Sequence, residues 1–143
     1  MPIQQGATNA FKLGLTNGTF DFNTDTFKIA LYTGAANIGA DTAAYTTTGE
    51  TSGTGYVAGG NALTVSVAPT FGSVPSNTTL YLSFSDVTWS PAAFTARGAL
   101  IYKVGGGDPT VCVLDFGGDK TATTTFTVQF PAANSTNAII RIA

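Results

Sequence analysis

The sequence predicts an all-β fold, which we expect to be an antiparallel β-sandwich or jelly-roll-like domain formed by the whole chain, residues 1–143. Apolar and alternating stretches of strand length recur along the chain. Turns rich in glycine and aspartate separate these stretches. After Phe20 no segment has the helical pattern of about 10 to 15 residues that alternates with strands in a parallel sheet. These three features favour a single β-domain with at most one short helix.

The only helical pattern lies near the N-terminus and predicts a helix over residues 9–16. Thr8 or Asn9 can cap the first turn, since a side-chain oxygen at that position accepts a bond from a free backbone N–H. Apolar residues four positions apart follow and share one helical face. Gly18 then supplies a stop signal, because glycine adopts the left-handed conformation that ends many helices.

The first strand is predicted at Phe27–Tyr32, where FKIALY places apolar side chains on both faces. Both faces of this strand are therefore expected to be partly covered. Six further strands are predicted at residues 62–68, 80–84, 99–104, 110–115, 125–130 and 138–142. Two glycine-rich segments, 105–109 and 117–120, are predicted to be hairpin or corner loops, because glycine supplies positive φ and Asp closes local hydrogen bonds.

The segment of residues 33–61 has no clear strand pattern and contains five glycines between Gly49 and Gly60. A loop of this length in a small domain is usually functional or ordered by a neighbour. We therefore predict an interface arm that Tyr45 and Tyr56 anchor on a partner, because tyrosine gives a large contact area with few rotamers to freeze. The alternative is that both tyrosines fold back onto their own domain and the glycines only turn the chain.

The composition argues against catalysis. Charged residues make up 10% of the chain, where about 25% is usual, and there is no histidine and one cysteine. Enzymes of this size ordinarily use a histidine, a metal cluster or a pair of carboxylates. We therefore expect no enzymatic activity, no catalytic residues, no bound metal and no cofactor. A surface with so few charges is instead expected to be covered largely by partner proteins.

Two classes of partner are not expected. The net charge of −2 and six scattered cations do not give the basic surface that binding to a nucleic acid backbone requires. No apolar run approaches the ~20 residues that span a bilayer, so a membrane role is not expected either.

Two local motifs invite a chemical interpretation that their sequence does not support. The stretch Asp21 to Asp25 begins like a calcium-binding loop, but Thr26 stands where the loop needs glycine and Tyr32 where it needs glutamate. A turn before a strand is the better interpretation. Cys112 lies between two valines in a predicted strand, so we expect a buried, unreactive thiol.

Several aromatic residues of the second half form a possible platform for sugars. They are Tyr81, Phe84, Trp89, Phe94 and Tyr102. Because each aromatic ring buries about 150 to 250 Å² and these rings are spread over neighbouring strands, we expect them to build the core instead.

Five stretches of the chain carry a family resemblance: FKIALYTGAA, YTTTGETSGTGYVAGGNALT, DVTWSPAAFTARGALIYK, VCVLDFGGDKTATTTFTVQFP and AIIRI. Together, from about Phe11 to Ile142, they resemble a family of small virion structural proteins of tailed bacteriophages. The resemblance implies a capsid decoration, or cement, protein of β-sandwich or jelly-roll type on the outer capsid surface. Its expected partners are the phage major capsid protein and further copies of itself, as a homo-dimer or homo-trimer. The resemblance implies no catalytic residues, and such a protein would be made in the bacterial host cytoplasm.

Two other functions compete with decoration. A tail- or fibre-associated module would bind a receptor or glycan through exposed aromatic residues, and only a few copies would be present per particle. A small virion hydrolase would need an acid and base pair, yet the acidic residues lie mostly in predicted turns. Decoration fits the composition best, with a glycan- or receptor-binding tail module as the alternative.

Overall fold

The computed structural model describes residues 3–72, 78–134 and 137–142. In this part of the chain one helix and ten strands follow one another. In chain order they are β1 (Gly6–Ala7), α1 (Asn9–Asn17), β2 (Phe27–Tyr32), β3 (Asn61–Leu63), β4 (Val65–Phe71), β5 (Leu80–Phe84), β6 (Val87–Trp89), β7 (Phe94–Lys103), β8 (Thr110–Ala122), β9 (Phe126–Val128) and β10 (Ile140–Ile142).

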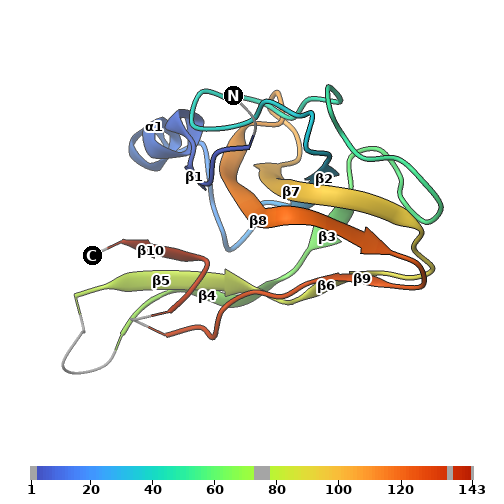
Figure 1. Ribbon diagram of the computed structural model, residues 1–143. Coiled ribbons are helices and arrows are strands. Elements are labelled where there is room, and N and C mark those ends of the chain that lie inside the picture. Colours follow the sequence, from blue (N-terminus) through green and yellow to red (C-terminus); the bar gives the residue numbers. More distant parts are fainter. Residues whose placement is uncertain (1–2, 73–77, 135–136, 143) are drawn as a thin grey trace.

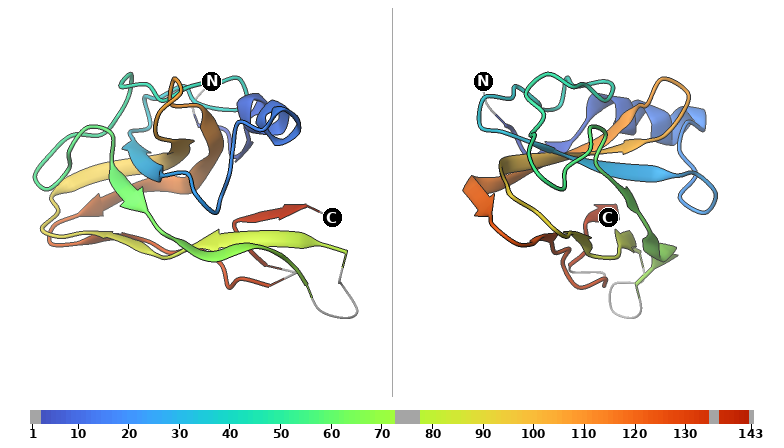
Figure 2. Two further views of the ribbon diagram at one scale, coloured as in Figure 1. Left: turned by 180° about the vertical axis from the view of Figure 1, so that it is seen from behind. Right: turned by 90° about the vertical axis from the view of Figure 1, so that its right-hand side faces the viewer.

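The strands form two layers, so that the domain is sandwich-like (Figure 1). One layer is a five-stranded sheet in the order β1-β8-β7-β2-β3. The other layer contains the three-stranded sheet β10-β5-β4 and the pair β6-β9. All strand pairs are antiparallel. The two views of Figure 2 show the same layers, with α1 beside the five-stranded sheet. The prediction of an all-β antiparallel domain with one short helix is confirmed.

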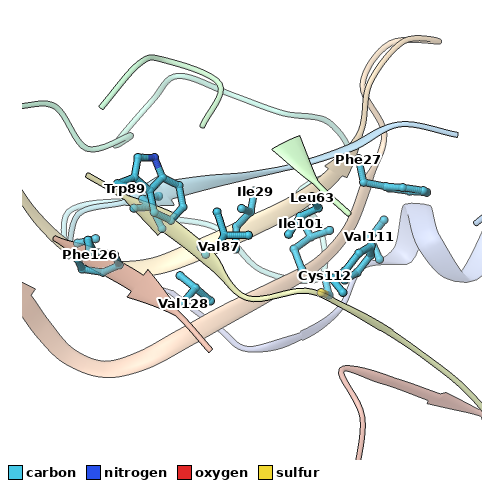
Figure 3. Packing of buried hydrophobic residues seen from close by; sticks show 14 of the residues in the cluster. Phe27, Ile29, Leu63, Val87, Trp89, Ile101, Val111, Cys112, Phe126 and Val128 are labelled. Atoms are coloured by element: carbon cyan, nitrogen blue, oxygen red, sulfur yellow. The ribbon is translucent and has the colours of Figure 1, made fainter. Parts of the chain in front are cut away.

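The main core lies between the two layers (Figure 3). Phe27 and Ile29 of β2 are fully buried there, and Phe84 and Trp89 reach it from the opposite layer. The ring of Phe27 stacks on that of Phe22, with centroids 4.6 Å apart. Burying one such side chain stabilises the fold by about 1.5 to 3 kcal/mol, so this core supplies most of the driving force.

The helix begins and ends where its caps predict. Thr8 is the N-cap: its Oγ1 accepts a hydrogen bond from the Phe11 amide at 3.1 Å and donates one to the Thr110 carbonyl at 3.0 Å. Gly18 ends the helix in the left-handed conformation with φ of 78°. The predicted range of residues 9–16 is therefore confirmed to within one residue.

The predicted strand at residues 62–68 is divided in two. Asn61–Leu63 pairs with β2 in the five-stranded sheet, whereas Val65–Phe71 pairs with β5 in the opposite layer. The chain changes layers at Thr64, which lies between them. No pattern in the sequence predicted β1 or β6, which are only two and three residues long.

The loop predicted at residues 117–120 is not a loop. These residues lie inside β8, which continues to Ala122. Ala96 pairs with Lys120 and Gly98 with Asp115, so β8 has several residues more than β7 over this interval and forms a bulge. Gly117 has φ of 82°, a conformation that glycine adopts without strain. The other predicted loop, residues 105–109, does connect β7 to β8.

Candidate functional site

Most of the segment predicted to be an interface arm lies over the outer face of the five-stranded sheet (Figures 1 and 2), whereas Thr54 pairs with Ala93 and Tyr56 reaches Trp89 of the other layer. We call residues 33–60 the covering loop. Three backbone hydrogen bonds fix its path: from Thr33 N to Gly49 O at 2.9 Å, from Thr51 N to Leu31 O at 2.9 Å and from Tyr45 N to Asp108 O at 3.0 Å. The sandwich therefore has a third, irregular layer on this side.

A second apolar cluster fills the space under the covering loop. The sheet contributes Ala30, Tyr32, Leu100, Tyr102 and Val113, all of which are buried. The covering loop adds Ala36 and Ile38, and Ile3 joins them from the N-terminal segment. Because alternate residues of a strand point to opposite faces, β2 is apolar at both parities. The expectation that both faces of this strand are covered is confirmed.

Glycines of the covering loop allow its backbone to approach the sheet closely. Gly60 has φ of 77°, and a Cβ there would lie 1.8 Å from the carbonyl oxygen of Ile29. Gly55 has φ of 86°, and a Cβ there would lie 1.8 Å from the carbonyl oxygen of Pro91. No side chain fits at either position, so only glycine allows the loop to lie this close to the rest of its own domain.

Glu50 is the centre of the hydrogen bonds within the covering loop. Its carboxylate accepts bonds from the Tyr45 hydroxyl at 2.7 Å, the Tyr56 hydroxyl at 2.5 Å and the Gly59 amide at 2.8 Å. The Tyr102 hydroxyl donates to the Gly59 carbonyl at 2.7 Å and so connects this network to β7. One half-buried carboxylate therefore joins the middle of the loop to its last residues, and Gly59 connects these to the sheet.

The tyrosines around Glu50 are held as neutral donors. Burial, and next the hydrogen bond to Glu50, raise the pKa of both Tyr45 and Tyr56. Burial, and then the charge of Asp108, raise the pKa of Tyr102 to about 12. Tyr32 also has a raised pKa, first because of burial and then because of the Glu50 charge. Ionisation of any of these hydroxyls would place a second negative charge near the carboxylate.

Tyr45 and Tyr56, the two predicted anchors for a partner, contact their own domain. The Tyr45 ring stacks on Tyr102 with centroids 4.8 Å apart. The Tyr56 ring packs on Trp89 and its hydroxyl accepts a bond from the Leu31 amide at 2.9 Å. This is the alternative that the sequence left open. The physical reason is the pair of bonds to Glu50, which turns both hydroxyls inward. Binding of a partner by these residues stays a prediction.

Sequence reasoning missed the role of Glu50, although one signal points to it. Glu50 is the only charged residue between positions 42 and 85, and it lies between the two tyrosines. A lone carboxylate in so long an uncharged stretch is a candidate for an internal acceptor.

The calcium-like motif forms a turn, as expected. The Asp21 carboxylate accepts the Asn23 amide at 2.9 Å, and this bond to the Asn23 backbone lowers the pKa of Asp21. Asp25 accepts the Asp21 amide at 2.7 Å and lies 3.3 Å from the Lys103 ammonium. Both carboxylates are therefore used within the turn and by a lysine. Within residues 3–72, 78–134 and 137–142, no group of three or more His, Cys, Asp or Glu could hold a metal ion.

The predicted burial of Cys112 and of most of the aromatic residues is confirmed. Cys112 is buried, and burial raises the pKa of its thiol to about 12. Phe84, Trp89, Phe94 and Tyr102 are all buried. They therefore form core, and their faces are not available as a sugar platform.

An apolar groove, which the sequence did not predict, opens at one end of the sandwich. It has a volume of about 440 Å³ and lies between β1, α1, β8 and β10. Buried Phe11, Val111, Cys112 and Ile140 line it from two sheets and the helix. We call it the end groove. Its residues are distant in the sequence, so no local pattern indicates it.

Comparisons of the chain with protein-family models, with curated proteins and with solved structures found no match. In the part of the chain that the structure describes, no helix is long and apolar enough to cross a membrane.

Proposed function

We propose that this chain is a structural virion protein that decorates the outside of a phage capsid and stabilises it by bridging major capsid protein subunits. One observation carries the proposal: the surface combines very few charges with large exposed apolar side chains. These side chains are Leu13, Leu15, Val57, Phe71, Val104 and Ile142. Exposed apolar surface on a chain that is only 10% charged favours a protein that is covered by partners in its working state.

The exposed apolar residues come from several elements, which suits a bridging role. Leu13 and Leu15 lie on α1, Val57 on the covering loop, Phe71 at the end of β4 and Ile142 on β10. A protein that stabilises a lattice has to contact at least two neighbours. Contacts spread over separate elements meet this requirement, whereas a single patch would serve only one partner.

The rigidity of the domain supports the same role. Glu50 and the glycines fix the covering loop before any partner binds, so association does not have to order it. A protein that binds only the assembled lattice stabilises it by mass action. A homo-dimer or homo-trimer on a lattice axis would add avidity, because several weak contacts then act together. A jelly-roll arrangement of the sandwich is part of the proposal, since the family resemblance implies it.

A tail-associated glycan-binding module has less support. That alternative depends on exposed aromatic residues, and four of the five aromatic residues considered for it are buried. A hydrolase has no support from the geometry either, because Glu50 and Asp25 are bound within the fold.

The proposal is tested by binding to assembled and unassembled capsid protein. Expanded capsids that lack this protein are mixed with the purified chain, and binding is measured by sedimentation. We expect saturable binding to the capsids, a higher capsid melting temperature and little binding to free capsid protein. Binding to isolated tails, with none to capsids, would contradict decoration and favour the alternative.

A further inference from the structure

The end groove lies where two sheet edges meet. β1 is the edge strand of the five-stranded sheet, and β10 is an edge strand of the opposite layer. Residues of both strands line the groove. Edge strands present backbone N–H and C=O groups to which another strand can add. The groove is thus bordered by groups that recognise an extended peptide and not only by an apolar surface.

The register of β1 places one residue in position to receive such a strand. Ala7 pairs with Cys112, and the Thr8 amide donates to the Val111 carbonyl at 3.1 Å. In an antiparallel ladder this pattern makes Ala7 a non-hydrogen-bonded partner of Cys112. The N–H and C=O of Ala7 therefore point away from β8, toward the open side of β1. Ala7 is exposed and lines the groove.

The charged side chains among the described residues of the groove are cations. Lys12 and Arg141 line it, and no Asp or Glu is among the described residues that do. A second hollow, of about 380 Å³, lies elsewhere along β8 and is lined by Phe116, Lys120 and residues of β9. No carboxylate is among its described lining residues either. With Lys12 in its lining, the end groove is complementary to an apolar ligand that carries carboxylates.

The rim of the groove is apolar in addition to its floor. Leu15 of the helix and Ile142 of the last strand line it and are 47% and 43% exposed. A volume of about 440 Å³ is within the usual range for a ligand site. Alternate side chains of an added strand would enter the groove, while the others would face solvent.

We propose that the end groove binds an extended segment of another protein that is apolar at alternate positions, carries carboxylates and adds as a strand along β1. Ala7 exchanges backbone hydrogen bonds with the segment, the apolar floor takes its inward side chains, and Lys12 attracts its carboxylates. In the role proposed above, this segment would belong to a neighbouring capsid subunit, and to that extent the inference rests on the proposed function. The binding site itself is tested without capsids.

The test is a nuclear magnetic resonance titration of the whole ¹⁵N-labelled chain. The probes are two blocked synthetic peptides that alternate valine and threonine, one with aspartate and one with lysine at both ends, and decanoate as a lipid-like anion. We expect the aspartate peptide to shift the amide signals of residues 5–7 and 140–142. We also expect it to bind about tenfold more tightly than the lysine peptide, because attraction at Lys12 is replaced by repulsion in the latter.

Three variants make the result specific. Lys12→Glu should reverse the preference between the two peptides, and Leu15→Asp should weaken both. Ala7→Pro removes the outward N–H and should abolish binding. Ala7→Pro can disturb the nearby helix cap. If this variant fails to fold, the variants at exposed Lys12 and Leu15 decide whether the groove binds the peptide. Lys120→Glu serves as the matched control, which should leave binding at the end groove unchanged.

Each other outcome overturns the inference. Equal binding of the two peptides, shifts outside the groove, or no binding would each exclude a strand site with this charge preference. Binding of decanoate alone would indicate a site for a lipid-like anion, and shifts that depend on protein concentration without any ligand would indicate a second copy of the chain. Failure of the two proposals can be told apart. Capsid binding that persists in Lys12→Glu and Leu15→Asp would support decoration and show that the groove takes no part in it. Peptide binding without capsid binding would support the groove as a binding site and contradict decoration.

Discussion

Replacing Glu50 tests whether the covering loop is held by a single carboxylate. Glu50→Ala removes the acceptor of two tyrosine hydroxyls and of the Gly59 amide, at 2.7, 2.5 and 2.8 Å. Hydrogen bonds to a charged group contribute about 1.5 to 3 kcal/mol each. Glu50 is only half-buried, so water can replace part of this interaction, and the three bonds share one residue. We therefore expect the free energy of unfolding to fall by roughly 2 to 4 kcal/mol.

Two matched variants make this loss interpretable. Glu50→Gln keeps the shape and one oxygen, so it should cost about 1 to 2 kcal/mol. Asp41→Ala removes an exposed carboxylate of the same loop, which accepts only the Asn9 side-chain amide at 3.0 Å, and should cost less than about 0.5 kcal/mol.

The assay is urea unfolding followed by circular dichroism, with the free energy extrapolated to water. The expected order of destabilisation is Glu50→Ala, then Glu50→Gln, then Asp41→Ala. If Glu50→Ala and Asp41→Ala gave the same stability, the carboxylate would not hold the loop and the reasoning would be refuted.

Three further predictions concern the loop and the core. Gly60→Ala should lower stability by more than about 3 kcal/mol, because φ is 77° and the new Cβ would lie 1.8 Å from the Ile29 carbonyl oxygen. The control Gly106→Ala, with φ of 67° and open space around it, should cost about 1 to 2 kcal/mol, and equal melting temperatures of the two variants would exclude close packing at Gly60. Fully buried Tyr32 has a raised pKa, so its contribution to the free energy of unfolding is complete below pH ~10 and is lost as the pH rises. Tyr32→Phe should therefore reduce the alkaline slope of the unfolding free energy by about 1.4 kcal/mol per pH unit, and an unchanged slope would contradict this. Cys112→Ser should cost about 1 to 3 kcal/mol of stability, because it puts a hydroxyl in a buried position. The native thiol should react with a thiol reagent far more slowly than the unfolded one, and rapid native labelling would show that it is accessible.

Local patterns in the sequence predicted the parts of the fold that local chemistry determines. The caps at Thr8 and Gly18 define α1, and the apolar residues at both parities of Phe27–Tyr32 predict a strand covered on two sides. Burial of Cys112 followed from its valine neighbours. In each case the residues that decide the structure are adjacent or a few positions apart.

The remaining features depend on pairing between distant segments. The strand pattern continues across Thr64, so nothing local indicates that β3 and β4 lie in different layers. A glycine pair such as Gly117-Gly118 suits a turn and a bulge equally, and only the pairing of β8 with β7 decides between them. For the same reason the covering loop was predicted to be an arm. Its glycines indicate backbone freedom in the sequence, whereas in the fold Gly55 and Gly60 provide room for contact with Pro91 and Ile29.

The proposed decoration role is tested most directly by the number of copies per particle. Purified virions that contain this chain are separated on a quantitative stained gel and compared with the major capsid protein, and immunogold labelling locates the chain. Because a decoration protein occupies equivalent sites of a symmetric lattice, we predict on the order of hundreds of copies distributed over the capsid surface. A few copies per particle, located at the tail, would contradict capsid decoration.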